Sequence, residues 1–198
     1  RNKFLIPTAI VLILIIGTIS YYAWKRVVTR KQEKAEYNST MIRDDINRNI
    51  IQSSEVARMI SSLFASNEAV IKAYEMPDDD QARAYLRKEL AGEFQALRKT
   101  ILNGYDLRIH FHKPPAQSLL REWRKPGDGD GGDDLSSFRS MVVKTIRTSK
   151  HYTGIEAGRG GLVVRGISPI TKKGKVLGSV ENFFLLTDVM NNMKLEEG

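Results

Sequence analysis

The feature that most constrains this chain is an uncharged apolar run, Phe4–Trp24, close to its first residue. A helix rises ~1.5 Å per residue, so about 20 residues cross the hydrocarbon layer of a bilayer. Tyr21, Tyr22 and Trp24 stand at the downstream end, where aromatic rings favour the membrane interface. A cleaved signal peptide is the alternative, but the run exceeds a usual signal core and no small-x-small site closes it. We therefore expect residues 1–30 to be a retained membrane anchor with its flanks.

The charges around this run bear on its orientation. A basic cluster that begins with Lys25 and Arg26 follows the run, whereas Arg1 and Lys3 precede it. The positive-inside rule would keep the downstream domain in the cytoplasm, although long domains translocate largely regardless of charge. Charge alone thus leaves the orientation open. Because the chain begins with Arg, we expect it to be a fragment of a longer protein.

Composition excludes several classes of function. The chain of 198 residues has a net charge of +8, but its first 30 residues hold five Lys or Arg and no acid, which leaves 26 basic against 23 acidic residues elsewhere. The excess positive charge therefore flanks the membrane run and does not indicate a nucleic-acid-binding face. The absence of cysteine excludes disulfides, thiolate zinc sites and thiol catalysis. A hydrophobic content of 41% fits a folded domain.

Two helices are predicted before any strand. Apolar or small residues recur at helical spacing over residues 31–75, and Pro77 ends the run. They are Ile42, Ile46, Ile50, Ala57, Ile60, Phe64, Ile71 and Tyr74. A long amphipathic helix of this kind usually packs on its own domain, on a second copy of the chain, or on both. A second helix is expected over residues 80–102, capped by Asp79 or Asp80 and closed by Asn103-Gly104.

Beyond Gly104 the period of the pattern changes to two, which predicts strands. We expect a half-buried strand over 105–112 with one apolar face, and a helix that starts at Asp133 or Asp134 and runs to about Ser149. The remaining expected elements are strands over 118–123, 152–157, 162–170 and 176–186, and a short helix over 187–194. The fold class is therefore α+β, with long helices first and then an antiparallel sheet into which one helix is inserted.

The residues of this second half resemble a known family. The similarity rests on these runs: Leu107-Arg-Ile-His-Phe-His112, Ser118-Leu-Leu-Arg-Glu-Trp123, Gly132-Asp-Asp-Leu-Ser-Ser-Phe-Arg139, Gly154-Ile-Glu-Ala-Gly-Arg-Gly-Gly161, Arg165-Gly-Ile-Ser-Pro-Ile170 and Gly178-Ser-Val-Glu181. Together they resemble the Cache-type extracellular sensor domains of bacterial chemoreceptors and sensor kinases. The resemblance implies a ligand pocket in a PAS-like module, dimerisation through the long helix, and a second membrane span after the domain.

The domain boundaries follow from this reading. Residues 31–104 hold the two helices, 105–194 the PAS-like sensor module, and 31–194 together form one Cache-like domain. Residues 195–198 would be a tail before a second span.

Two pairs of residues are candidates for the ligand site. His110 and His112 share one strand face, where they could bind a ligand or ligate a metal, with His151 as the only further histidine. Arg121 and Trp123 share a face if their segment is extended, an arrangement suited to a small anion with some apolar body. The alternatives without ligand binding are histidines that merely lie on the polar face of the strand, and an arginine stacked on tryptophan at the surface.

The last candidates flank a hairpin. Arg165 lies between apolar neighbours on an expected central strand, so its charge needs either a carboxylate such as Glu156 or a ligand. The aspartates between Asp128 and Asp134 lack the spacing of a calcium loop and are expected to form a solvated loop with a helix cap. We expect a ligand site of His110, His112, Arg121, Trp123, Glu156 and Arg165, with no catalytic set, metal or cofactor.

The sequence therefore predicts the periplasmic ligand-sensing region of a chemoreceptor in the bacterial inner membrane, which works as a homodimer and binds a small carboxylate or other organic anion. Its alternatives are the sensor of a histidine kinase or a diguanylate cyclase, and a membrane-anchored dimeric scaffold without a small ligand. A membrane-tethered hydrolase is a further rival class, disfavoured because no nucleophile–base pattern is present. Nucleic acid is not an expected partner.

Overall fold

The computed structural model describes residues 5–100, 106–158 and 160–192. Contacts divide the chain into two units, residues 1–45 and 46–198, and each is described by itself. In the first unit, the described residues form the beginning of helix α1 (Leu5–Ala65). This is the one described helix that is long and apolar enough to cross a membrane, judged by length and composition, and its apolar side chains between Ile10 and Trp24 are exposed.

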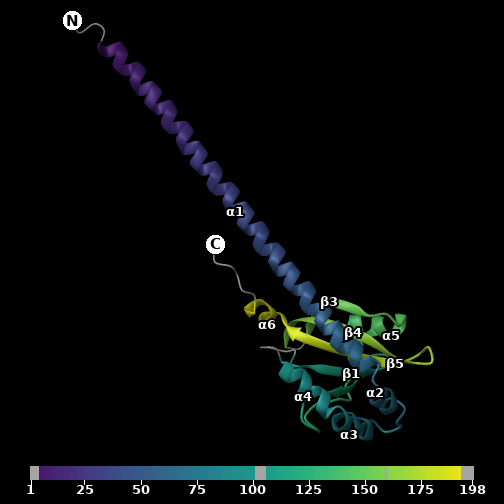
Figure 1. The fold of residues 1–198 in the computed structure, drawn as a ribbon. Helices are drawn as coiled ribbons and strands as arrows, with labels where there is room; N and C mark the ends of the chain where they lie inside the picture. Colours follow the sequence, from purple (N-terminus) through teal and green to yellow (C-terminus); the bar gives the residue numbers. More distant parts are fainter. Residues whose placement is uncertain (1–4, 101–105, 159, 193–198) are drawn as a thin grey trace. The chain divides into compact units, whose positions relative to one another are not determined.

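The second unit is built around one antiparallel sheet of five strands, in the order β2-β1-β5-β4-β3 (Figure 1). The strands are β1 (Ile109–Lys113), β2 (Gln117–Arg121), β3 (Tyr152–Gly158), β4 (Gly161–Lys172) and β5 (Lys175–Leu185). All five expected strands are present. The first begins at Ile109 rather than at 105, a residue outside those described, and the second ends before Trp123. The α+β class predicted from the sequence is confirmed.

The helices before the sheet are more broken than expected. The helix predicted over 31–75 ends at Ala65, because Asn67 adopts an extended backbone and its side chain accepts a hydrogen bond from the Ala69 amide (2.8 Å). Asn67 thereby caps a separate helix, α2 (Glu68–Ala73). The helix predicted over 80–102 is likewise two helices, α3 (Asp79–Glu89) and α4 (Ala91–Thr100), which meet at the buried Leu90.

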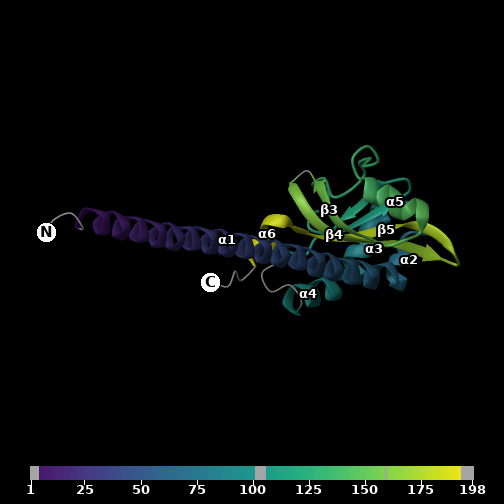
Figure 2. The ribbon, with the colours of Figure 1, turned by 90° about the horizontal axis from the view of Figure 1, so that it is seen from above.

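One face of the sheet is covered by the end of α1 within this unit and by the helices that follow it (Figures 1 and 2). Their core consists of apolar side chains from the helices and from alternate strand residues, among them Ala57, Ile60, Phe64, Ile109, Phe111, Val164, Val180 and Phe184. Gly166 of β4 marks the closest approach, because a Cβ there would lie 2.0 Å from the Arg58 backbone nitrogen. Only glycine allows β4 to touch the α1 backbone at this point.

The other face of the sheet carries helix α5 (Ser140–Thr148), seen on the far side from α1 in Figure 2. The helix begins at Ser140, so its predicted start at Asp133 or Asp134 was wrong. Asp134 instead accepts hydrogen bonds from the backbone and hydroxyl of Ser136, which closes a local turn. The turns over 134–139 place Leu135 in a small second core with Ala116, Val142 and Ile167. The chain then continues from β5 into α6 (Leu186–Asn191).

Candidate functional site: a cavity beside a buried charged network

A carboxylate lies at the centre of the sheet face opposite α1. Glu181 of β5 is fully buried, and Arg165 of the neighbouring β4 donates from Nη1 to its Oε2 (2.7 Å). Arg139, which directly precedes α5, contacts Oε1 of the same carboxylate. Glu156 of β3 adds a second acid, with its Oε2 3.2 Å from Arg165 Nη1. The buried Glu181 and the partly buried Glu156 are thus matched by two buried guanidinium groups, as buried charges require.

Both histidines of β1 join this network. His110 Nδ1 lies 3.1 Å from Glu181 Oε1, and His112 Nε2 lies 3.4 Å from the same oxygen. Their other ring nitrogens contact serine hydroxyls, Ser118 Oγ at 2.8 Å and Ser179 Oγ at 3.2 Å respectively. The expectation of a half-buried strand with one apolar face was wrong, because the segment before α5 covers the polar face as well and leaves both histidine side chains almost wholly buried.

Burial and charge set the protonation states of the network. Burial lowers the pKa of His110 well below its ordinary value, and the neighbouring His112 lowers it further. Burial also lowers the pKa of His112. For Glu181, burial alone would raise the pKa, but Arg139 and Arg165 outweigh it and hold the pKa well below the usual range. Near neutral pH the network therefore holds neutral imidazoles and an ionised carboxylate.

The histidines and Glu181 could also form the donor set of a metal site. Their potential ligand atoms lie within 4.8 Å of one another, and all three side chains are buried. His151, the third histidine considered from sequence, does not complete the set, because its Nδ1 contacts Ser168 Oγ (2.9 Å). Both oxygens of Glu181 are already engaged by guanidinium groups, so a cation would have to displace an arginine.

Arg121 and Trp123 hold the opposite side of the site. Arg121 pairs with Asp133 (2.8 Å) and donates to the Gly129 carbonyl (2.9 Å), which fixes the Gly/Asp-rich segment against β2. Arg87 of α3 secures the same segment through Asp130 (3.0 Å). Asp130 is buried, so this part of the segment differs from the solvated loop that was expected.

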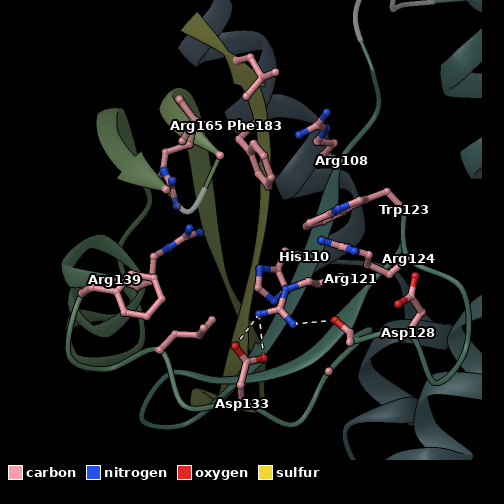
Figure 3. A pocket seen from close by; sticks show the side chains of 18 residues that line it. Arg108, His110, Arg121, Trp123, Arg124, Asp128, Asp133, Arg139, Arg165 and Phe183 are labelled. Atoms are coloured by element: carbon pink, nitrogen blue, oxygen red, sulfur yellow. Dashed lines mark hydrogen bonds and ion pairs between the residues drawn. The ribbon is translucent and has the colours of Figure 1, made fainter.

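Between these two sides lies a cavity of about 500 Å³. Figure 3 shows Arg139 and Arg165 on one side of it and Arg121, Trp123 and Arg124 on the other. Its lining consists of these residues together with Arg108, His110, Asp128, Gly129, Gly131, Asp133, Leu135, Phe138, Gly158, Gly160, Val163, Phe183 and Leu185. The volume falls in the range of small-molecule sites, ~300–1,000 Å³.

The six residues chosen from the sequence divide into two groups. His110, Arg121, Trp123 and Arg165 line the cavity, whereas His112 and Glu156 do not line it and contact the charged network behind it. Sequence reasoning missed Glu181, Arg139 and Phe183. The signal for Glu181 was available, because a lone acid among apolar residues of a central strand needs a buried partner just as Arg165 does.

The comparisons with known proteins agree with this architecture. A sequence model of the family described as the double sensory domain of two-component sensor kinases matches residues 39–198. The chain belongs to this Cache-type family, and the resemblance predicted from the sequence is confirmed. The family is one of sensor domains and not of catalytic domains. No curated protein matches the chain.

The solved structures that resemble the chain have little sequence in common with it. The sensor domain of the Vibrio cholerae histidine kinase DctB matches with a TM-score of 0.63 at 10% identity, over 83% of this chain and 62% of that one. The Escherichia coli DcuS sensor domain matches with a TM-score of 0.49 at 13% identity, over 73% of this chain and 99% of that one. The ligand-binding domain of the Campylobacter jejuni chemoreceptor Tlp3, in complex with L-valine, matches with a TM-score of 0.48 at 12% identity. It is covered to 63%, and this chain to 78%. The chain thus spans about three fifths of the DctB and Tlp3 domains.

Proposed function

We propose that this chain is the extracytoplasmic ligand-sensing region of a bacterial transmembrane receptor, and that it binds a small organic anion in the cavity beside β4. Membership of a sensor-domain family supports the sensory role, and the apolar start of α1 supports attachment to a membrane. The sensor family, and not the charge around the span, is the reason to place the domain in the periplasm on the inner membrane.

The choice of an anion rests on the unpaired hydrogen-bond donors of the Arg165 guanidinium group. Its Nη1 is used by Glu181 and Glu156, but among the described residues neither its Nε nor its Nη2 has a hydrogen-bond partner. These two N–H groups lie on one edge of the planar guanidinium, the fork that receives both oxygens of a carboxylate. Leaving a buried donor without a partner costs about 1–3 kcal/mol, so an anion at this fork would be favoured.

Ligand entry would require a small local movement. Nε and Nη2 of Arg165 are enclosed, and Gly158 lies so close that a Cβ on it would be 3.8 Å from Nη2. A carboxylate therefore reaches the fork when the guanidinium turns towards the cavity. Such a movement gives the bound and free states different conformations, which a sensor needs if a ligand is to shift its equilibrium. A coupling of about 1–3 kcal/mol is typical of linked sites.

The output of the receptor is a separate part of the proposal. The family description names two-component sensor kinases, which favours a histidine kinase. The chemotaxis transducer expected from the sequence is the second candidate, and a diguanylate cyclase is a third. We further propose that the receptor is a homodimer that associates through α1, where Ile51, Met59 and Leu63 are exposed.

Thermal unfolding of the full chain in detergent micelles tests the sensory role. We would measure the melting temperature with organic acids, amino acids and divalent metals, first for the wild type and then for Arg165→Lys and Arg121→Ala. A ligand at 100 times its Kd should add about 2.7 kcal/mol of stability, a shift of several degrees. A shift with a carboxylate that Arg165→Lys reduces to half or less is the expected result. No shift with any acid, amino acid or metal would favour a scaffold without a small ligand.

A further inference from the structure

The cavity has a continuous aromatic wall. The rings of Trp123 and Phe183 meet edge to face, with centroids 5.3 Å apart, and Trp123 meets His110 in the same way at 5.7 Å. The guanidinium of Arg165 lies over the Phe183 ring, with Cζ 5.7 Å from its centroid. Figure 3 shows Phe183 between Arg165 and Trp123. The wall therefore begins directly beside the unpaired fork and runs away from it.

Apolar side chains line other parts of the same cavity. They are Leu135, Phe138, Val163 and Leu185. A ligand with its carboxylate at Arg165 would have the rest of its body among rings and aliphatic groups, where burial of apolar surface favours binding. A flat ring suits the wall best, because aromatic pairs gain from edge-to-face contacts beyond their buried area.

The arginines of the cavity offer one buried position for an anion rather than two. Arg121 is paired with Asp133. Arg139 uses Nη2 for Glu181, so its buried Nε, which has no hydrogen-bond partner among the described residues, is a single donor and not a two-donor fork. Arg108 lies 3.5 Å from Asp106, and Arg124 is exposed to solvent. Among the lining arginines whose side chains are described, Arg165 has the buried Nε–Nη2 fork without an acceptor. A dicarboxylate would therefore find a match for only one of its two charges in the buried part of the site.

The charges near the fork disfavour an ammonium group. Glu181 is engaged through both oxygens by arginines. Oε1 of Glu156 accepts hydrogen bonds from the Met141 amide and the Ser140 hydroxyl, whereas its buried Oε2 has no hydrogen-bond partner among the described residues and lies 3.2 Å from Arg165 Nη1. An α-amino acid would bring its ammonium group beside two guanidinium groups, which repel it. A carboxylate without a neighbouring positive charge fits better.

From these observations we propose that the ligand is an aromatic monocarboxylate, with its carboxylate on the Arg165 fork and its ring against Phe183 and Trp123. This inference rests on the proposed function and narrows it to one chemical class. Phe183 and Trp123 then determine specificity, whereas Arg165 provides affinity for any carboxylate that enters.

Tryptophan fluorescence gives a direct readout of this position. The chain has two tryptophans, Trp24 and Trp123, so Trp24→Phe leaves Trp123 as the single reporter in the full chain in micelles. Phenylacetate is the probe, and it is compared with cyclohexylacetate, succinate and phenylalanine. Phenylethanol, which keeps the ring and lacks the charge, is the uncharged control. We expect phenylacetate to change the Trp123 emission saturably and to bind most tightly of the five.

Two variants separate the ring from the charge. Phe183→Leu keeps an apolar side chain and should weaken phenylacetate about two- to twelvefold, the equivalent of one aromatic pair, with little change for cyclohexylacetate. Arg165→Lys should weaken both carboxylates by about 10- to 100-fold, because the fork is lost. Melting curves of each variant establish whether it is folded. If Arg165→Lys does not fold, Phe183→Leu still tests the proposal, because it leaves the charged network intact.

The outcomes separate the two proposals. Succinate or phenylalanine binding more tightly than phenylacetate, in a manner that depends on Arg165, would overturn the aromatic class and leave the anion sensor standing. Equal weakening of phenylacetate and cyclohexylacetate by Phe183→Leu would also overturn it. If phenylethanol binds saturably and as tightly as phenylacetate, the carboxylate does not contribute to binding, and its proposed place on the Arg165 fork is wrong. Failure of every carboxylate to bind folded protein would overturn the proposed function itself.

Discussion

The two faces of the sheet are made from alternate residues of the same strands, yet they are held together in different ways. On the α1 face, Ile109, Phe111 and Val180 pack in an apolar core. On the opposite face, the residues next to them in the chain, His110 and Glu181, belong to a buried charged network. Apolar packing is non-directional and tolerates rearrangement, whereas a buried ion network is satisfied in few geometries. The first face therefore supplies stability, and the second supplies a defined site.

The largest effect is expected from loss of the central charge on the network face. Glu181→Leu leaves Arg139 and Arg165 buried without their main acid, which should lower the free energy of unfolding by about 3–5 kcal/mol. Chemical denaturation of the full chain in micelles, followed by circular dichroism, measures this. The double variant Glu181→Leu with Arg165→Met should recover part of the loss. A single variant as stable as the exposed control Asp128→Asn would show that the network is not the constraint described here.

A truncation on the α1 face should cost a similar amount for a different reason. Phe111→Ala removes a wholly buried ring from the apolar core, and such changes cost about 3–5 kcal/mol through lost burial and a residual cavity. Unlike the loss of Glu181, this loss should vary little between pH 7.5 and 5.5, because no titratable group of the network is changed. If the difference in the free energy of unfolding between Phe111→Ala and wild type depends strongly on pH, the two faces are not stabilised in the different ways described above.

The contact between β4 and α1 gives a smaller effect. Gly166→Ala places a Cβ against the backbone of Ala57 and Arg58, and overpacking of this kind typically costs about 1–3 kcal/mol. Gly92→Ala is the matched control, because a Cβ there meets nothing within 4 Å and alanine favours the helix. Melting temperatures of the two variants should move in opposite directions. A neutral Gly166→Ala would mean that α1 does not press on β4.

The pH dependence of stability sharpens the comparison further. The pKa values of His110 and His112 are lowered in the folded state by burial, so unfolding releases imidazoles that take up protons below about pH 6.5. Their contribution is complete above that pH and is lost as the pH falls through it. The pKa of Glu181 is also lowered, so its contribution is lost at still lower pH.

We therefore expect the melting temperature to fall from pH 7.5 to 5.5, and the double variant His110→Gln, His112→Gln to reduce that slope. His151→Gln changes a histidine that is exposed and lies outside the network, and it should keep most of the slope. An unchanged slope in the double variant would contradict the assignment of neutral, buried imidazoles.

Much of the fold could be read from local pattern. The period of two around Ile109 and Phe111 located β1, and the turn glycines located the hairpins that end in β4 and β5. The break at Asn67 could not be read in the same way, because that side chain caps a helix only when the chain turns there. The local alternation around His110 predicted a half-buried strand, with its apolar face in the core and its polar face outside it. What buries that polar face is the segment before α5, which is information about tertiary contacts.

The candidate site was predictable only in part for the same reason. Arg165 was recognisable as a charge that needs a buried partner, and Glu156 was a nearby candidate in the sequence. Glu181 comes from β5, which the sheet order places beside β4 and Arg165, and Arg139 comes from the turn before α5 and pairs with Glu181. The position of Phe183, two residues beyond Glu181 on the same face, follows directly once Glu181 is known.

The close contact at Gly166 has a mechanical consequence. Gly166 follows Arg165 directly, so the residue that faces the cavity and the residue that touches the α1 backbone are neighbours on one strand. A side chain at that point could take up small displacements of the strand by changing its rotamer. Because no side chain separates them, the backbones of β4 and α1 are in direct contact. A slight shift of the strand at Arg165 is therefore transmitted to the helix backbone at Ala57 and Arg58.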